Sequence, residues 1–474
     1  MARAQVTDLV VVVPGIMGSR LADADGRPVW DLSGAALWHG LRTLGGSLRA
    51  LRLPKDTGDG HPGDGVVPVG LMPDVHAIPG IWHPVDGYTG LLGSLERSFT
   101  LTPGENLLPF PYDWRLSCRY SAERLKEAVD RRLEGWRASA PGRRDARVVL
   151  VCHSLGGLVA RHYVERLGGH EVTRRVITLG TPHRGSLDAL AHLVNGLRRG
   201  WGPFGLDLTD FARSLPSLHQ LTPDYACVAG AGAGAGAGGL AYARDLPGLP
   251  GVDHGLLRDA AAFHADLRRA AAGRPSPTPL HAVTGIGQPT HTTAELTGDE
   301  LVPLWLIDGV DELGDGTVPR LAARPANADG TGYQVDESHT PCEQHGSLQN
   351  NQGVRDALAG LLGREAPFHR DGERESVPLS VLAPPLLAPG VPYEVSVTVP
   401  SETRDHDGLH LTAELRPADG TEPPIRTVRP LGEGRYAVSF PAPSPGAYRL
   451  AVRVTDRPET TVTALSLVGG PDGE

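Results

Sequence analysis

The feature that most constrains this chain is an apolar run that leads through one serine into a helical pattern, Val148-Val-Leu-Val-Cys-His-Ser-Leu-Gly-Gly157. The run predicts a buried β-strand, and the residues from Leu155 to Leu167 have helical spacing. A tight turn of this kind holds the serine hydroxyl exposed at the start of the helix, where a neighbouring base can make it a nucleophile. The alternative is that Ser154 only caps the helix, since serine is favoured at that position.

Such a turn requires small residues two positions before and two positions after the serine. Gly156 meets this requirement on one side. Cys152 stands on the other side, where glycine is usual. Because cysteine is also small, the turn tolerates it, and the pattern still predicts a nucleophile at Ser154.

Other segments repeat the order of strand and helix. The run from Leu9 to Val13 is apolar throughout and is closed by Pro14-Gly15, as expected of a parallel strand that is buried on both faces. Further strands are predicted at 147–152, 175–179 and 279–285, and helices at 122–138 and 352–362. Strands that alternate with helices indicate a doubly wound sheet, and with the serine turn they predict an α/β-hydrolase fold.

Residues 186 to about 280 interrupt this order, so we expect a cap or lid inserted into the fold. The Gly-Ala tract at 230–239 has too little side chain to pack and is expected to be a flexible loop. The apolar residues of the insertion could form a lid that binds an acyl chain, or could be the underside of helices packed on the sheet. They are Trp201, Phe204, Leu206, Leu208, Phe211, Leu215, Leu218 and Leu221.

After about residue 372, apolar and polar residues alternate along short segments that Pro and Gly separate. The segments lie at 393–399, 409–415, 436–440 and 448–454. Alternation with a period of two predicts antiparallel strands with one buried face. We therefore expect an α/β-hydrolase domain over residues 1–372, with its insertion at about 186–280, and an immunoglobulin-like antiparallel β-sandwich over residues 373–474.

Charge and cysteine content narrow the possible partners. The formal net charge is −10 and no basic run stands out, which argues against a nucleic-acid partner and against tight docking on anionic membranes. The four cysteines form no CxxC pair, and His, Cys and acidic residues do not cluster at ligand spacing. We therefore expect no metal and no organic cofactor.

The N-terminal apolar run ends in Pro14-Gly15 and has no small-residue cleavage site, so it is interpreted as a strand and not as a signal peptide. No apolar run approaches the roughly 20 residues that a membrane-spanning helix needs. We therefore expect a cytoplasmic protein with reduced thiols.

A serine that attacks an acyl group needs two backbone N–H donors, because negative charge develops on the carbonyl oxygen in the transition state. Leu155, directly after the serine, supplies one of them. The loop Pro14-Gly-Ile-Met-Gly-Ser19 follows an early strand and is suited to supply the other through Ile16. The alternative is that this loop is only a tight turn.

An acid and a base follow the serine in the order that this fold requires. Asp315 stands between two glycines, where a carboxylate on a loop can orient an imidazole, although Asp-Gly is also common in ordinary turns. His345 lies just before the helix predicted at 352–362 and is the favoured base. His339 is the alternative base, and His153 is expected to be structural.

Five segments together resemble the lecithin:cholesterol acyltransferase family of α/β hydrolases. They are VPGIMGSRL at 13–21, FPYDWRL at 110–116, CHSLG at 152–156, LGTPHRGS at 179–186 and GDGTVP at 314–319. The resemblance spans roughly residues 8–362 and implies acyl-ester chemistry. It implies the following roles: Ser154 as nucleophile, Asp315 as orienting acid, His345 as base, and the amides of Ile16 and Leu155 as oxyanion hole.

The block Tyr112-Asp-Trp-Arg115 is the most family-specific of these segments. Its side chains could line the pocket or anchor the core beneath it. An Asp and an Arg within a mostly apolar block suggest buried, paired charges, so we favour the structural role. Trp30, in a segment after the first motif, could lie in a lid.

The leading hypothesis is a serine hydrolase that cleaves or transfers the acyl group of a carboxylic ester, with a hydrophobic, lipid-like substrate. The same residues would also serve an amidase or a thioesterase. A hypothesis of another class is a catalytically idle fold used as a binding module, in which the C-terminal domain recruits a protein or a glycan.

Overall fold

The computed structural model of the chain describes residues 3–31, 51–55, 57–74, 86–199, 206–230, 239–274, 277–327, 340–363, 377–403, 405–418 and 421–469. Its centre is a five-stranded parallel sheet in the order β5-β1-β6-β7-β11. The strands are β1 (Leu9–Val13), β5 (Leu107–Pro109), β6 (Val148–His153), β7 (Thr173–Leu179) and β11 (Leu280–Val283). Because β1 and β6 are neighbours, the loops that follow them meet at the carboxyl edge of the sheet.

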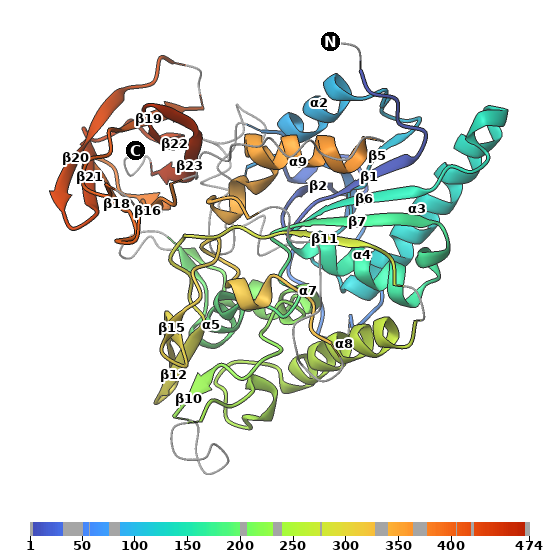
Figure 1. Cartoon of the computed structure of the whole chain (residues 1–474). Coiled ribbons are helices and arrows are strands. Elements are labelled where there is room, and N and C mark those ends of the chain that lie inside the picture. The colour runs from blue at the N-terminus through green and yellow to red at the C-terminus, as the bar shows by residue number, and fades with distance from the viewer. Residues whose placement is uncertain are drawn as a thin grey trace.

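Helices cover both faces of this central sheet, with one pair on each face (Figure 1). The pairs are α2 (Thr89–Ser98) with α9 (Gln352–Leu362), and α3 (Cys118–Ala138) with α4 (Leu155–Arg166). Successive side chains of a strand point to opposite faces. The even-numbered residues of β1 pack in the cluster that holds α2 and α9, and the odd-numbered ones pack with α3 and α4. The architecture fits the predicted α/β-hydrolase fold.

The predicted elements of the central sheet are observed with small shifts at their ends. β1 and α9 begin and end at the predicted residues, whereas α3 begins at Cys118 and not at residue 122. Ser117 caps α3 by accepting the N–H of Tyr120 at 3.2 Å, so the helix starts earlier than its Leu spacing indicates. The helix α2 and the short strand β5 were not predicted.

The insertion consists mainly of short elements around one long helix. Its elements and those of the hairpins after β11 are α5 (Leu187–Asn195), β8 (Arg198–Arg199), β9 (Leu206–Asp207), α6 (Thr209–Arg213), α7 (Pro216–His219), β10 (Val228–Ala229), α8 (His254–Ala272), β12 (Thr293–Thr297), β13 (Glu300–Leu304), β14 (Leu306–Ile307) and β15 (Val310–Asp311).

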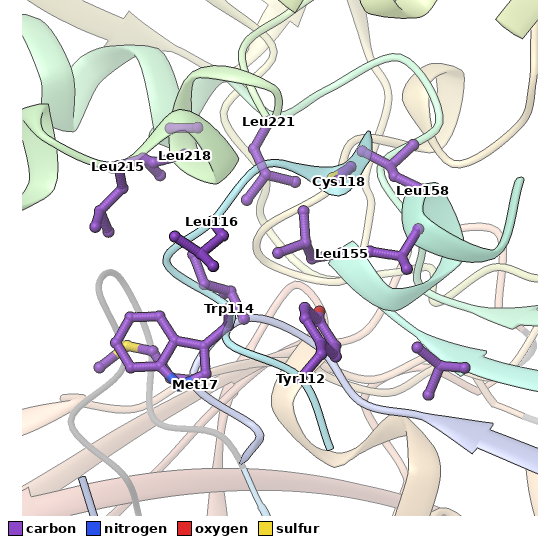
Figure 2. Packing of buried hydrophobic residues seen from close by; sticks show 14 of the residues in the cluster. Met17, Tyr112, Trp114, Leu116, Cys118, Leu155, Leu158, Leu215, Leu218 and Leu221 are labelled. Atoms are coloured by element: carbon purple, nitrogen blue, oxygen red, sulfur yellow. The ribbon is translucent and has the colours of Figure 1, made fainter. Parts of the chain in front are cut away.

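Of the eight apolar residues named above as a possible lid, five have described side chains, and all five are buried in the same cluster as the odd-numbered side chains of β1. They are Leu208, Phe211, Leu215, Leu218 and Leu221. Figure 2 shows Leu215, Leu218 and Leu221 beside the 112–118 segment and the first turn of α4. For these five, the interpretation as the underside of packed helices applies, and the lid interpretation does not. Trp201, Phe204, the side chain of Leu206 and residues 231–238 of the Gly-Ala tract lie outside the described residues.

A small sheet in the order β3-β2-β4 follows β1. Its strands are β2 (Ser19–Ala22), β3 (Pro28–Trp30) and β4 (Val67–Leu71), and short 3₁₀ segments elsewhere are η1 (Pro141–Arg143), η2 (Gly169–Glu171), η4 (Ala243–Asp245), η5 (Arg320–Ala322) and η6 (His345–Asn350). Trp30 is buried, donates its indole N–H to the Met17 carbonyl at 3.0 Å, and meets Trp114 edge to face. Trp30 is therefore a core residue and not part of an exposed lid.

The C-terminal part forms one curled eight-stranded sheet in the order β16-β18-β21-β20-β19-β22-β23-β17 (Figure 1). Its strands are β16 (Ser380–Leu382), β17 (Leu386–Leu387), β18 (Tyr393–Thr398), β19 (Leu411–Pro417), β20 (Ile425–Gly432), β21 (Arg435–Phe440), β22 (Gly446–Val454) and β23 (Arg457–Val468). All neighbouring pairs are antiparallel except β17 with β23. The predicted antiparallel strands are therefore present, whereas the immunoglobulin-like topology stays a prediction. The boundary expected at residue 372 lies outside the described residues.

The block from Tyr112 to Arg115 anchors the core. The guanidinium of Arg115 is fully buried, and it donates to Asp113 at 2.7 Å and to Asp64 at 2.8 Å. The Tyr112 hydroxyl donates to the Pro14 carbonyl at 3.0 Å and so fixes the loop after β1. These contacts give the block the structural role that we favoured from the sequence.

Removal of the Arg115 charge should destabilise the fold strongly, because the buried Asp113 carboxylate would lose its partner. We expect Arg115→Met to lower the free energy of unfolding by about 3–5 kcal/mol. The control Arg124→Met, which breaks an exposed ion pair with Glu127, should cost less than about 1 kcal/mol. Urea unfolding of both variants tests this, and equal losses in the two would contradict the anchoring role.

Candidate active site

Ser154 occupies the turn between β6 and α4. Its backbone has φ 51° and ψ −126°, a conformation that costs a residue other than glycine about 1–3 kcal/mol. Two hydrogen bonds hold the turn: the Ser154 N–H donates to the Leu179 carbonyl at 2.9 Å, and the Thr181 hydroxyl donates to the Ser154 carbonyl at 2.9 Å. Within the described residues, the Ser154 hydroxyl makes no capping hydrogen bond to α4. The alternative of a simple helix cap is therefore not realised.

The structure brings Ser154, His345 and Asp315 into one row of hydrogen bonds. His345 Nε2 lies 2.9 Å from Ser154 Oγ, and His345 Nδ1 lies 2.7 Å from Asp315 Oδ2. All three side chains are buried, with exposed fractions of 4%, 4% and 2% for Ser154, His345 and Asp315. A carboxylate that accepts Nδ1–H leaves Nε2 free to accept the serine proton. The alternative base, His339, lies outside the described residues.

The loop of Asp315 holds its carboxylate in a fixed orientation. Oδ1 accepts the backbone N–H groups of Thr317 at 3.0 Å and Val318 at 2.7 Å, which leaves Oδ2 for the imidazole. The backbone carbonyl of Asp315 also accepts the N–H of His345 at 2.7 Å. The two loops are therefore bonded through both backbone and side chain.

Gly180, at the carboxyl end of β7, leaves the space that this pair needs. A Cβ atom at position 180 would lie 2.9 Å from Asp315 Oδ2 and 3.0 Å from His345 Nδ1. Its φ of 57° is also one that residues with a side chain rarely adopt. Gly180 therefore leaves room for the packing of Asp315 against His345.

The loop after β1, which the sequence predicts to supply the second oxyanion donor, lies against the serine. A Cβ atom at position 15 would lie 2.9 Å from Ser154 Cβ, and Gly18 N–H closes the turn by donating to the Gly15 carbonyl at 3.1 Å. Among the described residues, the amides of Ile16 and Leu155 have no hydrogen-bond partner. Both amides can therefore donate to an oxygen bound beside the serine.

Tyr88 and His153 connect the loop of Gly15 to the loop of His345, and sequence reasoning missed the tyrosine. The Tyr88 hydroxyl accepts the Gly15 N–H at 2.8 Å and lies 2.9 Å from His153 Nδ1. His153 Nε2 lies 3.1 Å from the His345 carbonyl, which can only accept. Nε2 therefore carries the proton, and Nδ1 accepts from the tyrosine. His153 has a structural role, as expected, and it bonds directly to the backbone of His345.

Burial lowers the pKa of His153 to about 3, so this histidine is neutral at physiological pH. A folded-state pKa below the unfolded value of about 6.5 gives stability that is present above pH 6.5 and is lost as pH falls toward 3. We expect the free energy of unfolding to fall by about 2 kcal/mol more between pH 8 and pH 5 in the wild type than in His153→Gln. Urea titrations at both pH values test this, and identical pH dependences would contradict it.

All four cysteines are free, and Cys152 is fully buried at the end of β6. Within the described ranges, no group of three or more His, Cys, Asp and Glu side chains could hold a metal ion. In the same ranges, none of the helices has the length and apolar character needed to cross a bilayer. The cytoplasmic location stays a prediction from the sequence.

The parallel sheet with helices on both faces fits the α/β-hydrolase fold. The model of the lecithin:cholesterol acyltransferase family matches residues 88–229, a segment that includes the 110–116 block and the Ser154 turn. The resemblance to this family that the sequence indicated is therefore confirmed. The Gly15 loop, Asp315 and His345 lie outside the matched segment. No curated protein matches the sequence.

Several solved structures are similar to this chain at low sequence identity. The structure of the Tle4–Tli4 complex contains a chain with 18% identity and a TM-score of 0.45, covering 76% of this chain and 98% of that one. The Bacillus licheniformis lipase BlEst2 in its propeptide form has 14% identity and a TM-score of 0.34, covering 97% and 73%. Phospholipase PlaB from Legionella pneumophila has 12% identity and a TM-score of 0.34, covering 82% and 88%. These similarities are too distant to indicate an activity.

Proposed function

We propose that this chain is a serine hydrolase that cleaves or transfers the acyl group of a lipid-like carboxylic ester. The observation that carries the proposal is the buried row of hydrogen bonds from Ser154 through His345 to Asp315, at 2.9 and 2.7 Å. A serine hydroxyl becomes a nucleophile when a positioned base takes its proton, and an imidazole held by a carboxylate is such a base.

In the proposed reaction, Ser154 Oγ attacks the ester carbonyl while His345 Nε2 takes the hydroxyl proton. Asp315 keeps Nδ1 protonated and stabilises the imidazolium that forms. The carbonyl oxygen gains negative charge, and the amides of Ile16 and Leu155 donate hydrogen bonds to it. His345 then gives its proton to the leaving alcohol, which leaves the acyl group on Ser154.

The second half of the reaction repeats these steps with another nucleophile. His345 removes a proton from water or from a second alcohol, which attacks the acyl group and frees Ser154. Water gives hydrolysis, and an alcohol gives acyl transfer. The match to the lecithin:cholesterol acyltransferase family supports an acyl ester of lipid character as the substrate.

We also propose that the catalytic part comprises residues 1–372, with the insertion at about 186–280, and that residues 373–474 form a second domain with an immunoglobulin-like sandwich. The separation of the described strands into a central parallel sheet and a C-terminal curled sheet supports this division. The second domain also has a buried apolar cluster of its own, which includes Tyr393, Tyr436 and Phe440.

The proposal predicts that purified protein hydrolyses p-nitrophenyl esters and prefers long acyl chains to short ones. Ser154→Ala should reduce kcat/KM on the order of 10⁴-fold or more, down to background hydrolysis, because the attacking oxygen is lost. The matched control is Ser121→Ala, since Ser121 is also buried and its hydroxyl has no partner among the described residues. This control should keep wild-type activity.

Two results would contradict the proposal. One is turnover that persists in Ser154→Ala, which would place the chemistry elsewhere. The other is a complete lack of turnover by the folded wild type across esters, thioesters and amides, which would favour a binding role for the fold.

A further inference from the structure

The C-terminal sheet contacts the loop that carries His345. The thiol of Cys342 donates to the Leu379 carbonyl at 3.0 Å, and the side-chain amide of Gln344 donates to the Val381 carbonyl at 3.1 Å. Leu379 and Val381 lie just before and within β16. The residue directly before His345 is thus bonded to the first strand of the C-terminal sheet.

Glu343, between these two residues, is bonded to the other side of the same sheet. Its carboxylate is buried and accepts the backbone N–H of Thr463, in β23, at 2.7 Å. Its second oxygen accepts the side-chain amide of Asn351 at 3.1 Å, and Asn351 in turn caps α9. The His345 loop is therefore bonded to the C-terminal sheet at both β16 and β23.

Apolar packing and an ion pair fix the sheet in this position. Leu465 and Leu467 of β23 belong to the same buried apolar cluster as Leu155 and Leu158 of α4. Arg449 of β22 pairs with the buried Asp86, whose N–H donates to the Gly346 carbonyl at 2.8 Å. In Figure 1, β23 lies on the side of the curled sheet that faces the central sheet.

A cavity of about 120 Å³ lies where the two parts meet, and both His345 and Asp315 are in its wall. Five residues of the C-terminal part line the cavity, and all five are apolar. These residues are Val381, Leu382, Ala383, Pro385 and Leu465. The cavity therefore has a wall that the α/β part alone would lack.

The segment after β11 also lines the cavity. Pro289, His291 and Trp305 line it, and the Trp305 and His291 rings stack with centroids 4.1 Å apart. Leu382 is 63% exposed and Trp305 is 43% exposed, although both are large apolar side chains. Two such side chains facing a cavity beside a histidine favour a ligand with an apolar chain.

We propose that the C-terminal sheet completes the substrate site, and that the cavity between Leu382 and Trp305 binds the apolar chain of the ester. The inference rests on the proposed function for the identity of the ligand, since the cavity adjoins the base of that reaction. The apolar residues that line the cavity suit a hydrocarbon chain. The sheet then acts in substrate binding and not as a separate module for recruitment.

The test measures binding of dodecanoate to full-length Ser154→Ala by titration calorimetry, so that turnover plays no part. In this background, Leu382→Gln replaces the exposed wall residue with a polar one of similar size. Ile425→Gln is the matched control, because Ile425 is 65% exposed on β20 of the same sheet and does not line the cavity. We expect dodecanoate to bind about ten-fold more weakly to the Leu382 variant and within two-fold of the parent in the control.

Equal affinities in the two variants, or no binding of dodecanoate to Ser154→Ala, would overturn the inference. The failure of the proposed function is recognised separately, by the lack of Ser154-dependent ester turnover in the otherwise unchanged chain. If Ser154-dependent turnover is seen but the two variants bind dodecanoate equally well, the hydrolase function stands and binding in the cavity is excluded. If the Leu382 variant binds more weakly but no turnover is seen, binding in the cavity stands and the hydrolase function is excluded.

Discussion

The hydrogen bond between Ser154 Oγ and His345 Nε2 joins two residues that are 191 positions apart, and it requires three loops to meet within a few ångströms. The parallel sheet makes this possible, because β1, β6 and β7 all end at the same edge. The strained turn at Ser154, the turn at Gly15 and the glycine after β7 all lie at that edge. The space needed by the Asp315–His345 pair then explains why position 180 lacks a side chain.

Support for this hydrogen bond comes from residues that take no part in the proposed chemistry. Neutral His153 hydrogen-bonds to the backbone carbonyl of His345. Tyr88 hydrogen-bonds to both His153 and the Gly15 N–H, and so links His153 to the Gly15 loop. Glu343 and Gln344 bind the C-terminal sheet on the other side. His345 therefore lies between the central sheet and the C-terminal sheet, and residues from both parts hold its loop.

Local patterns were enough to predict part of this arrangement. Ser154 stands in a strand-to-helix turn and Asp315 stands between two glycines, and in both cases the neighbouring residues indicate the local backbone geometry. His345 was favoured because it lies just before α9. Tyr88 and Glu343 had no such signal, because their bonds to His153 and Thr463 cross 65 and 120 positions. The helical spacing of Leu215 and Leu218 is the same for a lid as for a core, so only the packing decides between them. The continuous curled sheet likewise depends on strand order, which alternation does not encode.

The central claim is that His345 activates the Ser154 hydroxyl, and covalent labelling tests it most directly. A fluorophosphonate probe reacts with a serine only when a base has made its oxygen nucleophilic. Peptide mass spectrometry of the labelled protein should find one modified residue, Ser154, and the label should be lost in His345→Ala while that variant stays folded. A label on another residue, undiminished labelling in His345→Ala, or no label on the folded wild type would contradict the account.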